Sequence, residues 1–241
     1  MRRPHRAPHQ IPRFSPVMRE LRRLRAGAAV LEVGSGSEGI GTWWRVPFIG
    51  VDLVFEFGRP PTLIPLYGNA MRLPVKEGAF DLVVCVAVLL HFEGERSIET
   101  ACAELARAAR GRVIVVTPAG RAAHESDLRM LEWCKREGIE PKPWLLHQIS
   151  YGELPEEQVI DALRPFGPVQ VGTTMSVPWN ERFFRAEQRM RQLRGSMTVV
   201  QPALRAWGRK RHTELASGGP PYERVFVLDR TATVSPPRDA S

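Results

Sequence analysis

Seven short apolar runs are spread along the chain, and they constrain its fold more than any other feature. They occupy residues 29–33, 48–53, 62–66, 80–86, 112–117, 169–173 and 224–228. A segment of helical periodicity, residues 96–110, separates the fourth run from the fifth. Alternation of this kind is typical of βαβ units. The sequence therefore predicts an α/β fold built around a mostly parallel sheet.

The chain length and the connections between the runs predict one domain with two insertions. A chain of 241 residues suits a single domain. Residues 121–151, with a helix expected over 125–137 and a stop at Gly138, predict a lid-like insertion, and residues 179–212 predict an arginine-rich helical one. For residues 179–212, a purely structural role is an equal alternative.

The remaining segments complete the predicted domain. Pro155 is expected to open another helix at its first turn. Residues 1–15 are expected to be a flexible basic tail and residues 231–241 a second flexible tail. The single domain is therefore predicted to span residues 16–230.

Composition and cysteine usage exclude several classes of protein. No apolar run approaches the roughly 18 residues that a membrane span needs. The basic N-terminal segment has no apolar stretch behind it, so it does not read as a secretory signal. The three cysteines, Cys85, Cys102 and Cys134, are odd in number, which predicts a protein of the reducing cytoplasm. They also lack the spacing of metal ligands, so no metal site is predicted.

The formal net charge of +8 raises the question of a nucleic-acid partner. Only Lys76, Lys135, Lys142 and Lys210 are lysines, and all other basic residues apart from histidine are arginines. A bias of this kind is often inherited from genomic base composition. The charge alone therefore does not predict nucleic-acid binding, and a nucleic acid is the less favoured partner.

The stretch VLEVGSGSEGIG, residues 30–41, places a glycine-rich turn directly after the first apolar run. Its glycines fit G-x-G-x-x-G, the pattern of a dinucleotide-binding turn. A pyrophosphate at this turn would face Glu32 and Glu38, and each repulsion would cost about 3 kcal/mol at a distance of about 5 Å and an effective dielectric constant of about 20. The two acids therefore favour a ligand that carries positive charge.

Four motifs in order resemble those of class I S-adenosylmethionine (SAM)-dependent methyltransferases of the small-molecule and quinone methylase type. The first is the run that enters the glycine turn, and the second is "FIGVDL", which ends the second run at Asp52. The third is Gly68-Asn69-Ala70, where the family usually has Gly-Asp-Ala, and the fourth is the run 80–86 that opens near Asp81. The resemblance implies a Rossmann-like, doubly wound, seven-stranded sheet with an antiparallel last strand and helical insertions.

The resemblance also implies which residues bind SAM. Asp52 would accept hydrogen bonds from the ribose hydroxyls, and Asn69 would accept one from the adenine amino group. The implied cofactor-binding residues are Glu32, Gly34, Ser35, Gly36, Asp52, Leu53, Gly68, Asn69, Ala70 and Val86. Simpler alternatives stay open, since Glu32 and Asp52 could have capping roles only and Asn69 could simply make a turn.

The sequence departs from the family pattern in three places. Glu38 occupies the position of the third glycine, with Gly39 one residue later. The helix after the turn must be short, because few residues separate it from the second run. Leu90 stands where an acid or amide often precedes the histidine. These departures affect an assumed mechanism more than cofactor binding.

Transfer of an activated methyl group mainly requires alignment of the reactants. His91 is the candidate base, because imidazole accepts a proton near neutral pH, although a core or capping histidine is an equal alternative. The candidate acceptor-binding residues are Trp144, His147, Tyr151, Arg182 and Arg185. Further arginines, Arg189 and Arg194, are expected with them at the rim of the acceptor pocket.

The favoured function is methyl transfer from SAM to a small-molecule, glycan or lipid-precursor acceptor, at oxygen or carbon. The acceptor could be anionic, and the protein is expected to be a monomer or homodimer. One alternative is a nucleic-acid methyltransferase that uses residues 179–212 against phosphates. The others are a nicotinamide-dependent oxidoreductase, disfavoured by the two acids, and a SAM-binding protein without catalysis.

Overall fold

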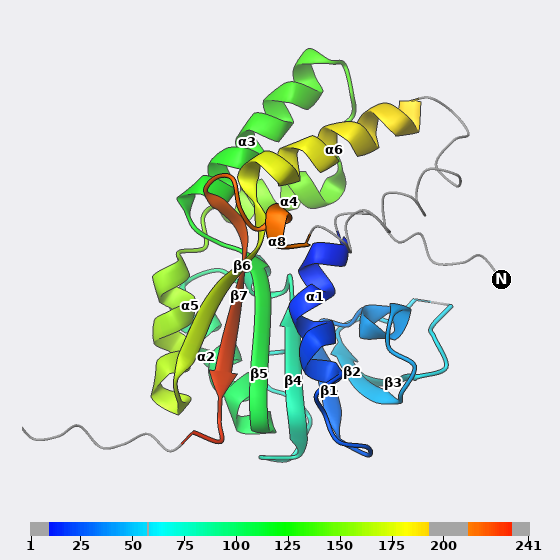
Figure 1. The fold of residues 1–241 in the computed structure, drawn as a ribbon, viewed down its shortest axis with the longest axis vertical. Helices are drawn as coiled ribbons and strands as arrows, with labels where there is room; N and C mark the ends of the chain where they lie inside the picture. Colours follow the sequence, from blue (N-terminus) through cyan, green and yellow to red (C-terminus); the bar gives the residue numbers. More distant parts are fainter. Residues whose placement is uncertain (1–9, 57, 193–211, 233–241) are drawn as a thin grey trace, which may run out of the picture.

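The computed structural model describes residues 10–56, 58–192 and 212–232 and contains one seven-stranded sheet (Figure 1). Its strands are β1 (Val30–Val33), β2 (Phe48–Asp52), β3 (Leu63–Tyr67), β4 (Phe80–Val86), β5 (Ala109–Pro118), β6 (Val169–Ser176) and β7 (Pro221–Asp229). The order is β3-β2-β1-β4-β5-β7-β6, and β7 runs antiparallel to both of its neighbours. All seven predicted strands and the antiparallel last strand are therefore confirmed.

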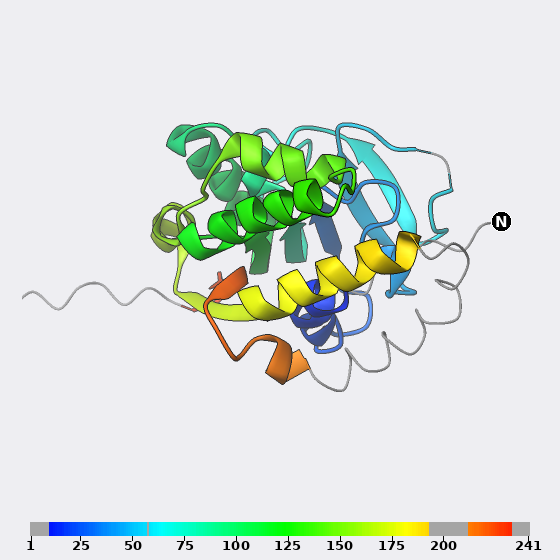
Figure 2. The ribbon, with the colours of Figure 1, turned by 90° about the horizontal axis from the view of Figure 1, so that it is seen from above.

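Helices cover both faces of the sheet and its upper edge (Figures 1 and 2). The α-helices are α1 (Gln10–Leu21), α2 (Glu95–Ala108), α3 (Arg121–Arg136), α4 (Pro143–Tyr151), α5 (Glu156–Leu163), α6 (Val177–Gln192) and α8 (His212–Leu215). The 3₁₀ helices are η1 (Gly39–Thr42), η2 (Leu89–His91) and η3 (Arg164–Phe166). Within the described ranges, no helix combines the length and apolarity that a membrane crossing needs.

The central strand β4 is apolar along most of its length because both of its faces are buried. Val83 and Cys85 pack in the core that α2 and α5 cover. Leu82, Val84 and Val86 alternate with them and pack in the core beneath α1. The period-two geometry of a strand thus supplies apolar side chains to two separate layers.

Helix α1 contradicts the expectation that residues 1–15 are a flexible tail. The helix begins at Gln10, and its residues Val17 and Leu21 are fully buried against the sheet. Pro16 inside the helix removes one backbone donor, and burial of the apolar face offsets that cost. Residues 1–9 lie outside the described residues, and the described part of the domain begins at Gln10 rather than at residue 16.

The two predicted insertions meet above the carboxyl ends of the strands (Figure 1). Helix α3 begins at Arg121, four residues before the expected start, and Gly138 follows it with a φ of +63°. Helix α6 begins at Val177 rather than at residue 179. Helices α3, α4 and α6 share a third apolar cluster with Tyr222 of β7. Residues 193–211 of the second insertion and residues 233–241 lie outside the described residues.

Candidate functional site

The glycine turn lines an open cavity of about 490 Å³ at the carboxyl ends of β1, β2 and β4. We call it the turn cavity. Its walls include Arg13, Phe14, Glu32, Gly34, Ser35, Gly36, Ser37, Glu38, Gly39, Trp43, Val54, Glu56, Val86 and Ala87. This is the edge at which open α/β sheets hold their ligands. Five of the predicted cofactor-binding residues therefore meet at one cavity, namely Glu32, Gly34, Ser35, Gly36 and Val86.

Glu32 holds the turn in place from beneath. Its side chain is buried, and its Oε2 accepts a hydrogen bond of 2.7 Å from the backbone N–H of Ile40. A Cβ on Gly39 would lie 2.0 Å from the same oxygen, which explains why this position is a glycine. Burial raises the pKa of Glu32 to about 8. Near pH 7 the Glu32 side chain is therefore largely neutral. The expectation that Glu32 repels a pyrophosphate is wrong for this reason. Glu38, by contrast, is exposed on the wall of the turn cavity.

Glu32→Gln is expected to flatten the dependence of stability on pH. Between its ordinary pKa, about 4.3, and its folded-state pKa of about 8, the unfolded state loses a proton that the folded state keeps. The free energy of unfolding should therefore fall as pH rises through this window, by up to about 1.4 kcal/mol per pH unit. Urea unfolding near pH 6 and near pH 8 measures the effect. Parallel pH curves for the two proteins would contradict the assignment.

Asp52 connects the turn to the exits of β2 and β3. Its Oδ2 accepts from the N–H of Gly36 at 2.7 Å, and its Oδ1 accepts from the N–H of Val54 at 3.3 Å. The N–H of Gly68 donates to the Asp52 carbonyl oxygen at 3.1 Å. The carboxylate has two oxygens with lone pairs to spare. The side chain therefore stabilises the turn, but Asp52 is not on the wall of the turn cavity, and its contact with a cofactor stays a prediction.

The third motif lies beside the turn cavity rather than on its wall. Asn69 is exposed, and its Oδ1 accepts from the N–H of Met71 at 2.9 Å, as expected of a turn residue. Ala70 is buried in the core of the sheet, and Leu53 is 68% exposed. Contact of Leu53, Gly68, Asn69 and Ala70 with a cofactor therefore stays a prediction.

A second cavity, of about 290 Å³, lies between η2, α4, α6 and β7. We call it the helix cavity. Its walls are Arg13, Ala87, Leu90, His91, Trp144, Gln148, Asn180, Phe184, Glu187 and Tyr222. Arg13 and Ala87 line both cavities. The two cavities therefore adjoin, as a cofactor site and an acceptor site would have to.

Ala87 lies at this junction with an unusual backbone conformation. Its φ is +55°, and it is the one non-glycine residue within the described ranges with a positive φ. Its N–H donates to the Val116 carbonyl at 2.7 Å, which holds the β4 exit against β5. Backbone strain of this kind, about 1–3 kcal/mol, is concentrated at functional sites. The observation supports a functional role for the junction.

His91, on η2, contacts two of the predicted acceptor-binding residues. The ring centroids of His91 and His147 are 5.5 Å apart, and those of His91 and Tyr151 are 5.7 Å apart. Desolvation, followed by the charge of His147, lowers the pKa of His91 below its ordinary value. His91 and Trp144 are on the wall of the helix cavity, whereas His147 and Tyr151 are not. All lie at the carboxyl end of the sheet, on the same side as Asp52.

The predicted rim arginines make contacts on their own helix or near it. Arg182 lies over the ring of Trp179 at 5.1 Å, and an Nη of Arg185 is 3.0 Å from Glu181. Neither lines the helix cavity. Arg189 lies 5.9 Å from the Trp133 ring centroid, and Arg194 lies outside the described residues. A substrate-binding role for these arginines gains no support from the geometry.

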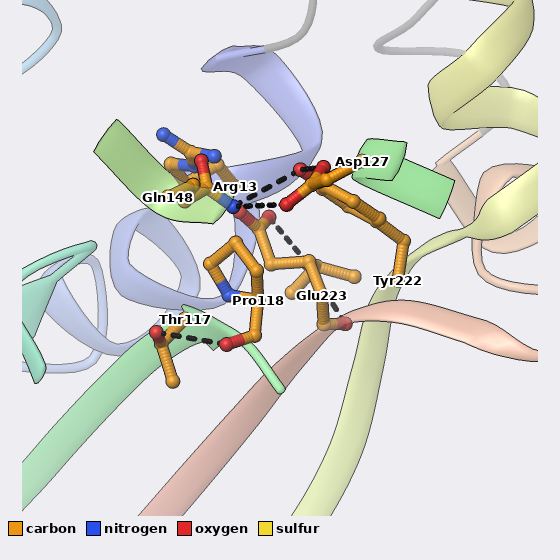
Figure 3. A network of polar contacts seen from close by, with 8 residues as sticks. Arg13, Thr117, Pro118, Asp127, Gln148, Tyr222 and Glu223 are labelled. Atoms are coloured by element: carbon orange, nitrogen blue, oxygen red, sulfur yellow. Dashed lines mark hydrogen bonds and ion pairs between the residues drawn. The ribbon is translucent and has the colours of Figure 1, made fainter. Parts of the chain in front are cut away.

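The sequence analysis missed a buried polar network beneath the helix cavity, to which α1, α3, α4, β6 and β7 contribute (Figure 3). Arg13 Nε donates to Glu223 at 2.5 Å, and Glu223 also accepts from Thr174 at 2.7 Å. Tyr222 donates to Asp127 at 2.8 Å, and Gln148 donates to the same carboxyl group at 3.1 Å. Burial raises the pKa of Asp127 to about 7. These hydrogen bonds fix the wall shared by β7 and α4.

One sequence signal could have revealed Arg13. Ile11, Phe14, Met18 and Leu21 recur at helical spacing before the first strand. Pro12 and Pro16 weaken this signal, because proline is disfavoured inside a helix. Glu223 and Tyr222 gave no signal, because their pairing with residues far away in the chain depends on the fold.

Comparisons with known proteins show what the chain is similar to in sequence and in fold. Residues 31–117 match the family model of a methyltransferase domain, and no curated protein matches the chain. A magnesium protoporphyrin IX methyltransferase from Synechocystis PCC 6803, with bound S-adenosylhomocysteine (SAH), is 16% identical, with 93% of this chain and 84% of that chain covered and a TM-score of 0.52. A geranyl diphosphate methyltransferase in complex with SAM is 13% identical, with 93% and 85% covered and a TM-score of 0.55. These structures share the fold.

Proposed function

We propose that this chain, an enzyme of the class I SAM-dependent methyltransferase type, methylates a small-molecule acceptor held in the helix cavity. SAM is the methyl donor. The observation that carries the proposal is that Ala87 and Arg13 line both cavities. A methyl group that leaves the turn cavity at this point would meet an acceptor in the helix cavity.

The residues of the turn cavity fit SAM. Asp52 is not on the wall itself but accepts a hydrogen bond from Gly36 of the turn, and in this proposal it also accepts from the ribose hydroxyls. A Cβ on Gly36 would meet nothing within 4 Å, so the turn leaves open space there. Glu38 adds negative charge for a ligand that carries a sulfonium and an ammonium group. Val54 and Val86 provide apolar wall. Charge and shape both favour SAM over a dinucleotide.

When bound, SAM supplies a methyl group that is already activated by the sulfonium. The protein must then align the acceptor, exclude water and, for a hydroxyl acceptor, remove a proton. His91 is on the cavity wall, and its lowered pKa keeps the imidazole neutral near pH 7. In this proposal His91 takes the proton of the acceptor, and Trp144 and Phe184 contact its apolar part.

The size of the helix cavity favours a small acceptor. A volume of about 290 Å³ is close to the lower end of the range of about 300–1,000 Å³ for small-molecule sites. Its wall combines aromatic rings with polar groups such as Asn180 and Gln148. An oxygen or carbon atom of such a molecule, glycan fragment or lipid precursor is the proposed methyl acceptor.

Calorimetric titration with SAH, NAD and NADP tests the proposed cofactor class. We expect SAH to bind with a measurable enthalpy and to raise the melting temperature, whereas NAD and NADP should do neither. Tight binding of NAD without binding of SAH would contradict the proposal and favour an oxidoreductase.

The titration of His91 provides a separate test of the proposed base. Its pKa is expected below the ordinary value of about 6.5, because the ring is partly desolvated and lies near His147. In His147→Gln, which removes the neighbouring charge, the pKa of His91 should rise. NMR titration of the imidazole protons measures both values. An ordinary pKa in the parent protein, unchanged in the variant, would remove the electrostatic argument for His91.

A further inference from the structure

One part of the helix cavity wall is polar, and α4 and β7 supply it. Gln148 and Tyr222 are on the wall, whereas Asp127 of α3 is not but is hydrogen-bonded to both (Figure 3). Asp127 and Tyr222 are almost fully buried, at 3% and 2% exposed. Polar groups enclosed to this degree keep fixed hydrogen-bond partners. The direction of these hydrogen bonds therefore determines which groups of a ligand the wall can bind.

The Asp127 carboxylate takes up donors from both wall residues. Its Oδ1 accepts from the Tyr222 hydroxyl at 2.8 Å, and its Oδ2 accepts from Nε2 of Gln148 at 3.1 Å. The same Nε2 also donates to the Tyr222 oxygen at 3.2 Å. An amide nitrogen carries two hydrogens and a hydroxyl carries one, so three bonds use three donors. Toward a ligand, the Gln148 and Tyr222 side chains can therefore only accept, through their oxygens.

Another part of the wall is aromatic. Trp144 and Gln148 are one turn apart on α4, so they share a face of that helix. The rings of Trp144 and Phe184 are edge to face, with centroids 5.9 Å apart and an angle of 90° between their planes. Both rings line the helix cavity. The wall thus suits a ligand with a flat apolar body and a polar group at one side.

The charges near the polar part of the wall do not favour an anion there. Arg13 also lines the helix cavity, but its Nε donates to the buried Glu223, whose carboxylate balances its charge. Burial raises the pKa of Asp127 to about 7, so above that pH this side chain is largely ionised. A carboxylate or phosphate oxygen next to Gln148 and Tyr222 would meet acceptors only, with a negative charge behind them.

We propose that Gln148 and Tyr222 bind a hydroxyl or amine group of the methyl acceptor as a hydrogen-bond donor, while Trp144 and Phe184 contact its flat apolar body. The inference rests on the proposed function, because it names the chemical class of the molecule in the helix cavity. In that function His91 takes the proton of the methylated hydroxyl, so the group bound here is a second donor on the same molecule. The anionic acceptor considered from the sequence is disfavoured.

Three probes with one ring system test the proposal near pH 8, where Asp127 is largely ionised. 2-Naphthol offers a hydroxyl donor, 2-methoxynaphthalene offers none, and 2-naphthoate is an anion. Side-chain NMR signals of His91 and Trp144, which are on the wall, report binding in the helix cavity. In the parent protein we expect 2-naphthol to bind roughly tenfold more tightly than either of the other probes, the usual effect of one hydrogen bond to a buried group.

Two substitutions change the hydrogen-bonding character of the wall in different ways. Gln148→Met keeps the length of the side chain without its oxygen, so 2-naphthol should lose most of its advantage over 2-methoxynaphthalene. In Asp127→Asn, the new amide nitrogen can donate to the Tyr222 oxygen, which frees the Tyr222 proton for a ligand. The preference for 2-naphthol over 2-methoxynaphthalene should then fall roughly tenfold. A purely structural role of Asp127 would weaken both probes alike.

A matched control makes the result specific to the cavity. Gln170→Met is the same substitution at an exposed glutamine of β6, and it should leave all three affinities unchanged. Unfolding curves establish that each variant is folded at the titration temperature.

The possible outcomes separate this proposal from the proposed function. If the parent protein fails to bind 2-naphthol in the helix cavity, binds the three probes alike or prefers 2-naphthoate, the proposal is wrong. An unchanged preference in both Gln148→Met and Asp127→Asn would also overturn it. The proposed function is tested by SAH instead. If SAH binds and the probes show no preference, only this proposal is wrong, and if SAH does not bind, the proposed function fails whatever the probes show.

Discussion

Replacing Gly34 with alanine is expected to destabilise the protein by about 3 kcal/mol and to abolish SAH binding. Gly34 has a φ of +75°, and an added Cβ would lie 2.0 Å from Cγ2 of Val88. Its N–H donates to the Val51 carbonyl at 2.8 Å, so the turn cannot move away without losing a backbone hydrogen bond. Backbone strain and overpacking therefore add at this position.

Gly36→Ala is the matched control for this effect. Gly36 also has a positive φ, +53°, but an added Cβ would meet nothing within 4 Å. Only the conformational cost of about 1–2 kcal/mol is expected. Urea unfolding measures both variants, and SAH calorimetry then shows whether the methyl group at position 36 obstructs the ligand. Equal destabilisation of the two variants would mean that Val88 yields easily and that the close contact is unimportant.

Asp52→Ala is expected to weaken SAH binding by about 1.5–3 kcal/mol, the usual effect of losing hydrogen bonds to a charged group. The variant loses the proposed ribose acceptor and also the bond from the N–H of Gly36, which orders the turn. Asp52→Asn keeps one oxygen acceptor and should lose less. Calorimetry measures the affinities, with unfolding curves as the check on folding.

Asn69→Asp serves as the control at the neighbouring strand exit. An Asp carboxylate can accept from the N–H of Met71 as the Asn oxygen does, so this variant should bind SAH like the parent.

Unchanged SAH affinity in a folded Asp52→Ala protein would exclude Asp52 as the ribose acceptor.

The sheet was predictable from the sequence because a strand that is buried on both faces appears as a continuous apolar run. The run 80–86 is apolar along most of its length, and it coincides with β4. The glycine turn was equally predictable, because Gly34, Gly36 and Gly39 all have positive φ angles, a backbone conformation that favours glycine and leaves a local glycine pattern in the sequence. The collisions of an added Cβ with Val88 or Glu32 become visible only in the folded structure.

The helix cavity was only partly predictable, because its wall depends on pairings over long distances in the chain. His91 was predicted because it follows the exit of the fourth strand, and Trp144 because it lies in the first insertion. Both are on the wall of the helix cavity. Arg13 and Glu223 are 210 positions apart, and neither belongs to a local pattern that indicates a site. The neutral state of Glu32 depends on its burial beneath the turn, which the sequence of the strand alone does not specify.

A crystal structure of the complex with SAH is the most direct test of the central claim that the two adjoining cavities form one methyl-transfer site. The account predicts SAH in the turn cavity, with its ribose hydroxyls on the Asp52 carboxylate and its sulfur facing the junction at Ala87, open to His91 and the helix cavity. SAH bound at another edge of the sheet, or bound with its sulfur turned away from Ala87, would contradict the account.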